Sequence, residues 1–153
     1  MSTFKMAGKR VAYTLDSTLE SVNHAEQTAS QVAAGAGFDE DEISRISMAV
    51  REGTVNAVLH GNAYDPQKKV GLSFERTADA LVITITDQGM GLDLGNVPDP
   101  LAPENLLKVS GRGIFLMRAF MDEVQVRPLH PGTELKLIKH VPGSAGGKKE
   151  VSQ

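Results

Sequence analysis

The stretch Glu52-Gly53-Thr54-Val55-Asn56-Ala57-Val58-Leu59-His60-Gly61-Asn62 decides how the rest of the chain is interpreted. Its apolar residues continue a helical periodicity that predicts a helix from about Asp39 to His60, ending at Gly61-Asn62. Glu52 and Asn56 are four residues apart, so they share one helix face, and His60 continues the line. A carboxylate beside an amide can hold hydrated magnesium, or can accept a proton from an attacking hydroxyl. Taken alone, however, the pattern is more typical of a solvated polar face.

Around this helix the sequence predicts short strands and two further helices. Asp16 or Ser17 is expected to cap the first helix, which Gly35 and Gly37 end, and Asp39 begins the second with acidic residues in its first turn. The elements add up to an α+β fold, a two-layer sandwich with helices packed on one face of a mixed or antiparallel sheet. The remaining expected elements are strands over 9–15, 69–75, 80–86, 123–127 and 133–139, and helices over 18–34 and 113–120.

Length and composition favour a single domain. The chain has 153 residues and 41% hydrophobic residues, which suits one core of ordinary size. The domain is expected to span 9–141. Residues 1–8 are expected to be a flexible N-terminus, and residues 142–153, rich in Gly, Ser and Lys, a disordered tail.

Several classes of site and partner are disfavoured by composition. The chain contains no cysteine, which excludes disulfides, thiolate metal sites and cysteine nucleophiles. The net charge is -3 and no basic stripe is present, so a nucleic-acid partner is not expected. The apolar stretches are too short to span a bilayer, and the basic start has no apolar run behind it. These features predict a cytoplasmic protein with no membrane partner.

A second candidate segment, Asp87-Gln88-Gly89-Met90-Gly91, directly follows the clearest predicted strand. An acidic side chain at the end of a strand can accept a hydrogen bond from an exocyclic amine such as that of adenine. Gly89 and Gly91 allow the backbone to approach a flat ligand closely. The alternative is an ordinary turn, in which Asp and Gly are also the commonest residues.

A third candidate segment, Ser110-Gly111-Arg112-Gly113-Ile114, opens the predicted helix over 113–120. Free backbone amides at a helix N-terminus bind anions, and Arg112 can add a charge-assisted contact to phosphate. The alternative is a glycine-rich cap without a ligand. The long segment between the second and third candidates, rich in Gly, Pro and Asp, is more typical of a functional lid than of a connector.

The order of these segments resembles the superfamily of gyrase, heat-shock chaperone, histidine-kinase and mismatch-repair ATPases. The similarity covers about residues 10–140, with an N box over 52–62 and glycine boxes over 87–91 and 111–113. Within that superfamily the chain is most similar to the anti-sigma factor serine kinases. The features that carry this are the His60-Gly61-Asn62 run, the run from Gly111 to Asp122, the Gly132-Thr133 strand and the short single-domain length.

The resemblance implies a role for each matching residue. Asn56 would ligand the Mg²⁺ that bridges the phosphates of ATP, and Glu52 would be the general base. Asp87 would bind the adenine amino group. His60 is more typical of a structural hydrogen bond than of catalysis. The remaining residues implied are Gly89 and Gly91 against the base, Gly111, Arg112 and Gly113 on the phosphates, Thr133 near adenine, and 92–110 as a lid.

The function implied is an ATP-dependent serine/threonine protein kinase that acts as an anti-sigma factor. It would bind a sigma factor and phosphorylate an anti-sigma factor antagonist, as a homodimer paired through the sheet near the N-terminus. One alternative is a nucleotide-binding partner-switch module that transfers no phosphate. Another is the catalytic domain of a histidine kinase, disfavoured because nothing before Ser17 supplies long dimerising helices.

Overall fold

The computed structural model describes residues 10–89 and 113–143. The expected flexible N-terminus over 1–8, the expected lid over 92–110 and residues 144–153 of the expected tail over 142–153 lie outside these ranges. Within the described part of the chain, no helix is both long enough and apolar enough to cross a bilayer.

Five strands form one sheet in the order β1-β2-β3-β5-β4. Each neighbouring pair is antiparallel, so of the two sheet types predicted the antiparallel one is present. The central strand β3 is rich in β-branched residues and alternates buried and half-buried positions, as a strand with one covered face does. The strands are β1 (Arg10–Asp16), β2 (Lys69–Arg76), β3 (Ala80–Asp87), β4 (Glu123–Pro128) and β5 (Thr133–His140).

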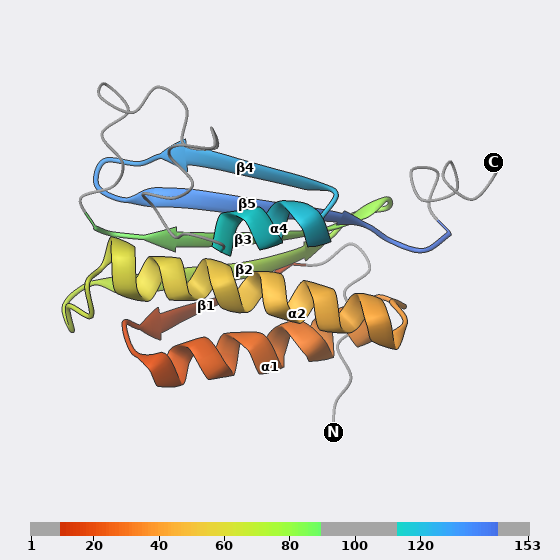
Figure 1. The fold of residues 1–153 in the computed structure, drawn as a ribbon, viewed down its shortest axis with the longest axis horizontal. Helices are drawn as coiled ribbons and strands as arrows, with labels where there is room; N and C mark the ends of the chain where they lie inside the picture. Colours follow the sequence, from red (N-terminus) through yellow and green to blue (C-terminus); the bar gives the residue numbers. More distant parts are fainter. Residues whose placement is uncertain (1–9, 90–112, 144–153) are drawn as a thin grey trace.

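The helices cover one face of this sheet, with α2 lying between α1 and α4 (Figure 1). The α+β two-layer sandwich is therefore confirmed. Its core lies between the layers and includes Val50 from α2, Phe74 from β2 and Ile83 from β3, all fully buried. The helices are α1 (Leu19–Gly35), α2 (Glu40–Val55), the π-helix η1 (Asn56–Gly61) and α4 (Gly113–Phe120).

The prediction for the cap of α1 was wrong, whereas that for α2 is confirmed. Thr18 caps α1, its side chain accepting a hydrogen bond from the backbone N–H of Ser21. Ser17 is buried and its hydroxyl donates instead to the carbonyl of Lys68, while the Asp16 carboxylate pairs with Lys69. Asp39 caps α2 as expected, accepting from the backbone N–H of Glu42 at 2.9 Å.

The second helix ends where the sequence predicted, but its last part is not α-helical. At Asn56 the chain changes from α2 to η1, which runs to Gly61. The backbone N–H of Asn62 then donates to the carbonyl of Ala57, five residues earlier, at 2.8 Å. Short π segments inside helices are frequent at functional sites, and periodicity of apolar residues does not distinguish them from α-helix.

Helix α2 lies close to the sheet because of Gly53. A methyl group added there would be 2.7 Å from Ile85 Cδ1 and 2.8 Å from Leu135 Cδ2. Gly53 therefore lets the C-terminal half of α2 approach β3 and β5 more closely than any larger residue would allow.

Candidate functional site

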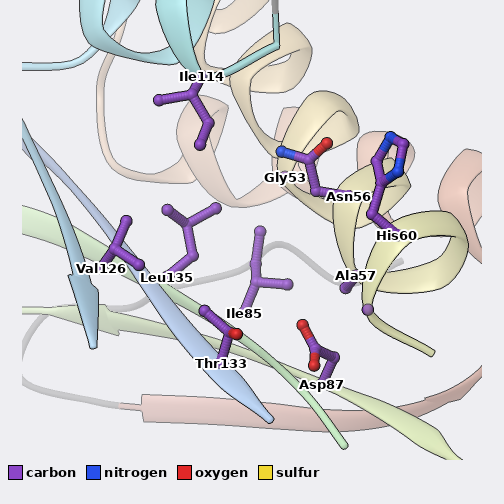
Figure 2. Close-up of a pocket in the computed structure, with 11 residues that line it drawn as sticks. Gly53, Asn56, Ala57, His60, Ile85, Asp87, Ile114, Val126, Thr133 and Leu135 are labelled. Atoms are coloured by element: carbon purple, nitrogen blue, oxygen red, sulfur yellow. The ribbon is translucent and has the colours of Figure 1, made fainter. Parts of the chain in front are cut away.

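A cavity opens between the C-terminal end of the α2–η1 helix and the adjoining ends of β3 and β5 (Figure 2). Asn56 and His60 project from the helix side, and Asp87 and Thr133 stand on the sheet side. Apolar side chains form most of the wall between them, so the few polar groups are set in a mainly hydrophobic lining, as is usual for a ligand pocket. The remaining lining residues are Gly53, Ala57, Gly61, Ile85, Ile114, Val126 and Leu135.

Asp87 is the buried charge of this cavity. It is the last residue of β3, is only 8% exposed, and pairs in the strand register with Thr133. Burial raises the pKa of Asp87 above its usual 3.8, while backbone hydrogen bonds from Gly89 and Thr133 and the charge of Lys68 oppose that rise. Its carboxylate is a strong acceptor in a site of low polarity, which suits a ligand that presents N–H donors.

Three glycines let the backbone pack closely around Asp87, and one of them, Gly61, faces the carboxylate itself. A methyl group on Gly61 would lie 2.4 Å from Asp87 Cγ, and one on Gly89 would lie 1.7 Å from the carbonyl oxygen of Gly61. Gly132 has a φ of +107°, and a methyl group there would lie 1.8 Å from the carbonyl oxygen of Asp87. The backbone therefore closes around Asp87 from three segments, and side chains are excluded from each.

The predicted stripe of Glu52, Asn56 and His60 is only partly brought into the cavity. Asn56 is half-buried and lines it, and within the described residues its side-chain amide makes no hydrogen bond. His60 lines the rim and is exposed, and the structural hydrogen bond expected of it is not found in the described part of the chain. Glu52 lies one turn before Asn56 on α2, half-buried and outside the cavity lining.

The phosphate-side residues are described only in part. Gly113 is the first residue of α4 and is buried, and the next residue, Ile114, lines the cavity. The N-terminal end of α4 therefore lies beside the same cavity as Asp87 and Asn56. Gly91, Gly111 and Arg112 lie outside the described residues.

Sequence reasoning missed one residue of this region, Asn62. It follows η1, is 1% exposed and hydrogen bonds to Ser17, Lys69 and Gln88. Its signal was an amide directly after the helix-ending glycine, but nothing in the sequence indicated that three separate segments converge on it.

Comparison with known proteins identifies the family to which this fold belongs. Residues 15–139 match the family described as the histidine kinase-like ATPase domain. The chain belongs to this family of ATPase domains. Membership implies that the domain binds ATP, and the expected superfamily is confirmed.

Relatives of this ATPase domain narrow the family further. The chain is 33% identical over 123 residues to serine-protein kinase RsbW of Halalkalibacterium halodurans, covering 76% of this chain and 75% of that protein. It is 34% identical over 136 residues to serine-protein kinase RsbW of Staphylococcus epidermidis, covering 83% and 84%. It is 35% identical over 106 residues to the anti-sigma F factor of Anoxybacillus flavithermus, covering 66% and 71%. The resemblance to the anti-sigma factor serine kinases is thereby confirmed.

A solved structure agrees with the ATPase fold. The crystal structure of the RsbU and RsbW domains of Rv1364c from Mycobacterium tuberculosis superposes with a TM-score of 0.62 at 18% identity. The match covers 88% of this chain and 33% of that larger one. At this identity it supports the architecture alone.

Proposed function

We propose that this protein is an ATP-dependent serine/threonine protein kinase that acts as an anti-sigma factor. It binds a sigma factor and phosphorylates an anti-sigma factor antagonist. The observation that carries the nucleotide part is the buried Asp87 carboxylate facing a largely apolar cavity. On the opposite side lies Asn56, whose side-chain amide has no hydrogen bond in the part of the chain that the structure describes. The names of the relatives, serine-protein kinase and anti-sigma F factor, support the kinase and sigma-factor parts.

The cavity suits an adenine base. Asp87 accepts a hydrogen bond from the exocyclic amine, and the apolar lining, including Ile85 and Leu135, packs against the ring. Gly89 and Gly91 keep the chain beside the base free of side chains, and Thr133 stands next to Asp87. The close packing of Gly61 against Asp87 fixes the position of the carboxylate at the wall of the cavity, where it can accept from a ligand.

The described residues offer few ligands to a metal ion. In the described ranges no group of three or more acidic or histidine side chains is placed to hold a metal ion. Mg²⁺ commonly takes few protein ligands and completes its shell with water and phosphate oxygens, so one amide oxygen from Asn56 fits this ion. When bound, Mg²⁺ neutralises charge on the phosphates. Gly111, Arg112 and Gly113 add backbone amides and a guanidinium on the phosphate side.

Glu52 is the proposed general base. It sits one helical turn before Asn56, so it is close to the proposed metal position without entering the base pocket. A carboxylate there accepts the proton of the attacking serine or threonine hydroxyl and orients it toward the phosphate.

Two substitutions separate binding from transfer. We expect Asn56→Ala to abolish ATP binding, because the metal loses its protein ligand. Glu52→Ala is expected to keep ATP affinity within about twofold and to lower phosphotransfer by about 100-fold or more, in the range of a lost general base. Calorimetric titration with MgATP measures the first and transfer of labelled phosphate the second. Equal loss of ATP affinity in both variants would contradict the division of roles.

The competing function is a nucleotide-binding module that transfers nothing, which the position of Glu52 outside the cavity lining favours. Incubating the protein with labelled ATP and a candidate antagonist distinguishes the two. Label on serine or threonine of the antagonist supports the kinase, whereas intact ATP binding without label on any antagonist excludes it. Label on histidine of this chain itself would indicate a histidine kinase instead.

The proposed setting is a cytoplasmic homodimer whose subunits pair through the sheet near the N-terminus. In the sheet, β1 is an edge strand with no neighbour on its outer side among the described residues. Sedimentation of the purified protein tests the dimer. Affinity capture from the native cell, with and without ATP, identifies the sigma factor and the antagonist.

A further inference from the structure

The side chain of Asn62 bonds to three segments of the chain, two of which are distant from it in sequence. Its Nδ2 donates to Ser17 Oγ at 2.9 Å and to the carbonyl of Lys69 at 3.0 Å. Its Oδ1 accepts from the backbone N–H of Gln88 at 2.8 Å. The residue is 1% exposed, so water does not replace these bonds, and both of its amide hydrogens are used.

The groups that bond to Asn62 make further hydrogen bonds of their own. Ser17 Oγ donates onward to the carbonyl of Lys68 at 2.6 Å, and the backbone N–H of Lys69 donates to Gln88 Oε1 at 2.6 Å. The backbone N–H of Asn62 completes the last turn of η1 by donating to Ala57. The start of α1, the start of β2 and the segment after β3 are therefore tied together at one buried amide.

Two of the tied segments also enclose the Asp87 carboxylate. Gly61, the residue before Asn62, lies against that carboxylate, and Gly89, the residue after Gln88, lies against the carbonyl of Gly61. Gly89 also donates its backbone N–H to Asp87 Oδ1 at 3.0 Å. Moving Gln88 away from Asn62 would move both the donor that orients the carboxylate and the glycine wall beside it.

We propose that Asn62 is a positioning residue that sets the preference of this site for a 6-aminopurine over a purine lacking the amine. It acts through Gly61 and the Gln88-Gly89 segment, which hold Asp87 in place, and it does not line the cavity itself. The inference rests on the proposed function, since it takes Asp87 as the acceptor of the adenine amine. A hydrogen bond to a charged acceptor discriminates only while its geometry is held.

The test compares the affinities of ATP and of purine riboside triphosphate, which lacks the amine. In the unmodified protein we expect ATP to bind at least about tenfold more tightly, the usual worth of a hydrogen bond to a charged group. In Asn62→Ala this ratio is expected to fall at least about fivefold. The affinity for purine riboside triphosphate should change less than the affinity for ATP.

The matched control is Ser47→Ala. Ser47 is a buried hydroxyl on α2 that bonds to Ser30 Oγ and to the carbonyl of Ile43, in a network outside the cavity lining. It is expected to lower the melting temperature while leaving the ratio unchanged. A ratio that falls equally in both variants, or that stays unchanged in folded Asn62→Ala, overturns the inference.

A second variant, Asn62→Ser, keeps the inference testable if Asn62→Ala does not fold. Asn62→Ser is smaller and keeps one polar group, and hydrogen exchange of the Gln88 amide reports directly on the lost bond. Faster exchange with a reduced ratio supports the role, and faster exchange with an unchanged ratio overturns it. If the unmodified protein binds neither nucleotide, the proposed function itself fails, which is a different result from either of these.

Discussion

At the level of a single side chain, the fold and the proposed ligand favour different protonation states of Asp87. Its burial raises the pKa of the carboxyl, which means that the fold disfavours the ionised form. The proposed ligand contact is strongest with that same ionised form. Stability and nucleotide affinity should therefore respond to pH in opposite directions at this residue.

The stability response can be assigned a sign. Because the folded-state pKa of Asp87 lies above 3.8, its contribution to stability is fully present below pH 3.8 and is lost as pH rises through the raised pKa. Relative to Asp87→Asn, the free energy of unfolding of the unmodified protein should fall across that window and then stay level. Urea unfolding of both proteins over a pH series measures the difference. A difference that grows with pH would show that the pKa is lowered instead.

The affinity for ATP should change with pH in the opposite direction to the stability. We expect ATP affinity of the unmodified protein to rise as pH increases through the same window, and that of Asp87→Asn to stay flat and lower by about 10- to 100-fold. Calorimetric titration at each pH gives both curves. Parallel curves for the two proteins would exclude Asp87 as the group responsible.

Among the elements, the contact of α2 with β3 and β5 sets the floor of the cavity. Gly53 allows this contact, and Glu52 and Asn56 flank it on the same helix. A helix interior normally disfavours glycine by about 1 kcal/mol relative to alanine, so a steric reason for glycine is to be expected here.

Replacing Gly53 by Ala tests that reason. The added methyl meets Ile85 and Leu135, and such overpacking costs about 1–3 kcal/mol, of which the better helix propensity returns about 1. We expect a net loss of up to about 2 kcal/mol in the free energy of unfolding, together with weaker ATP binding. Ser44→Ala, at an exposed position of α2, isolates the propensity and should change stability by less than about 0.5 kcal/mol. Equal stabilisation of both variants would refute the close packing.

Local pattern was sufficient to predict the elements but not the details of their ends. Alternating apolar residues located the strands to within about a residue or two, as usual for well-patterned segments. Thr18 displaced Asp16 and Ser17 as the cap because Ser17 is engaged by Asn62 and Lys68 across the fold. Asp87, Asn56 and Thr133 line one cavity. The resemblance, which the order of the segments carried, had assigned all three to one nucleotide site. The Asn62 network was missed because a hydrogen bond between residues 45 positions apart leaves no local pattern.

At the level of the whole protein, the side chain of Lys139 connects β5 to two helices. Lys139 lies near the opposite end of β5 from Thr133. Its ammonium lies 3.0 Å from Glu42 at the start of α2 and donates to the carbonyl of Phe120 at the end of α4, at 3.1 Å. Asp122 is 3.9 Å away, and the lysine side chain is only 16% exposed. One largely shielded charge thus connects α2 and α4 to the last strand.

Lys139→Met is expected to lower the free energy of unfolding by about 1–3 kcal/mol, because Glu42 and the Phe120 carbonyl lose a partner where water reaches poorly. Lys69→Met is the matched control. Its ion pair with Asp16 is shorter, at 2.6 Å, but the two side chains are 43% and 68% exposed, so less than about 1 kcal/mol is expected. Chemical denaturation of both variants makes the comparison, and an equal loss in the two would contradict the distinction by burial.

The change from α-helix to π-helix at Asn56 has a consequence for how the gene can vary in length. The wider turns between Asn56 and Gly61 accommodate more residues per turn than an α-helix does. Because a π turn holds about one residue more than the α-helical turn it replaces, deleting one residue there would let the segment relax to α-helix with the direction of the following chain kept. Inserting a residue would instead rotate everything after it by about 100°. Gly61 would then leave Asp87, and Asn62 would leave its three partners. The segment can therefore lose a residue more easily than it can gain one, and Gly61 itself has no room for a side chain beside Asp87.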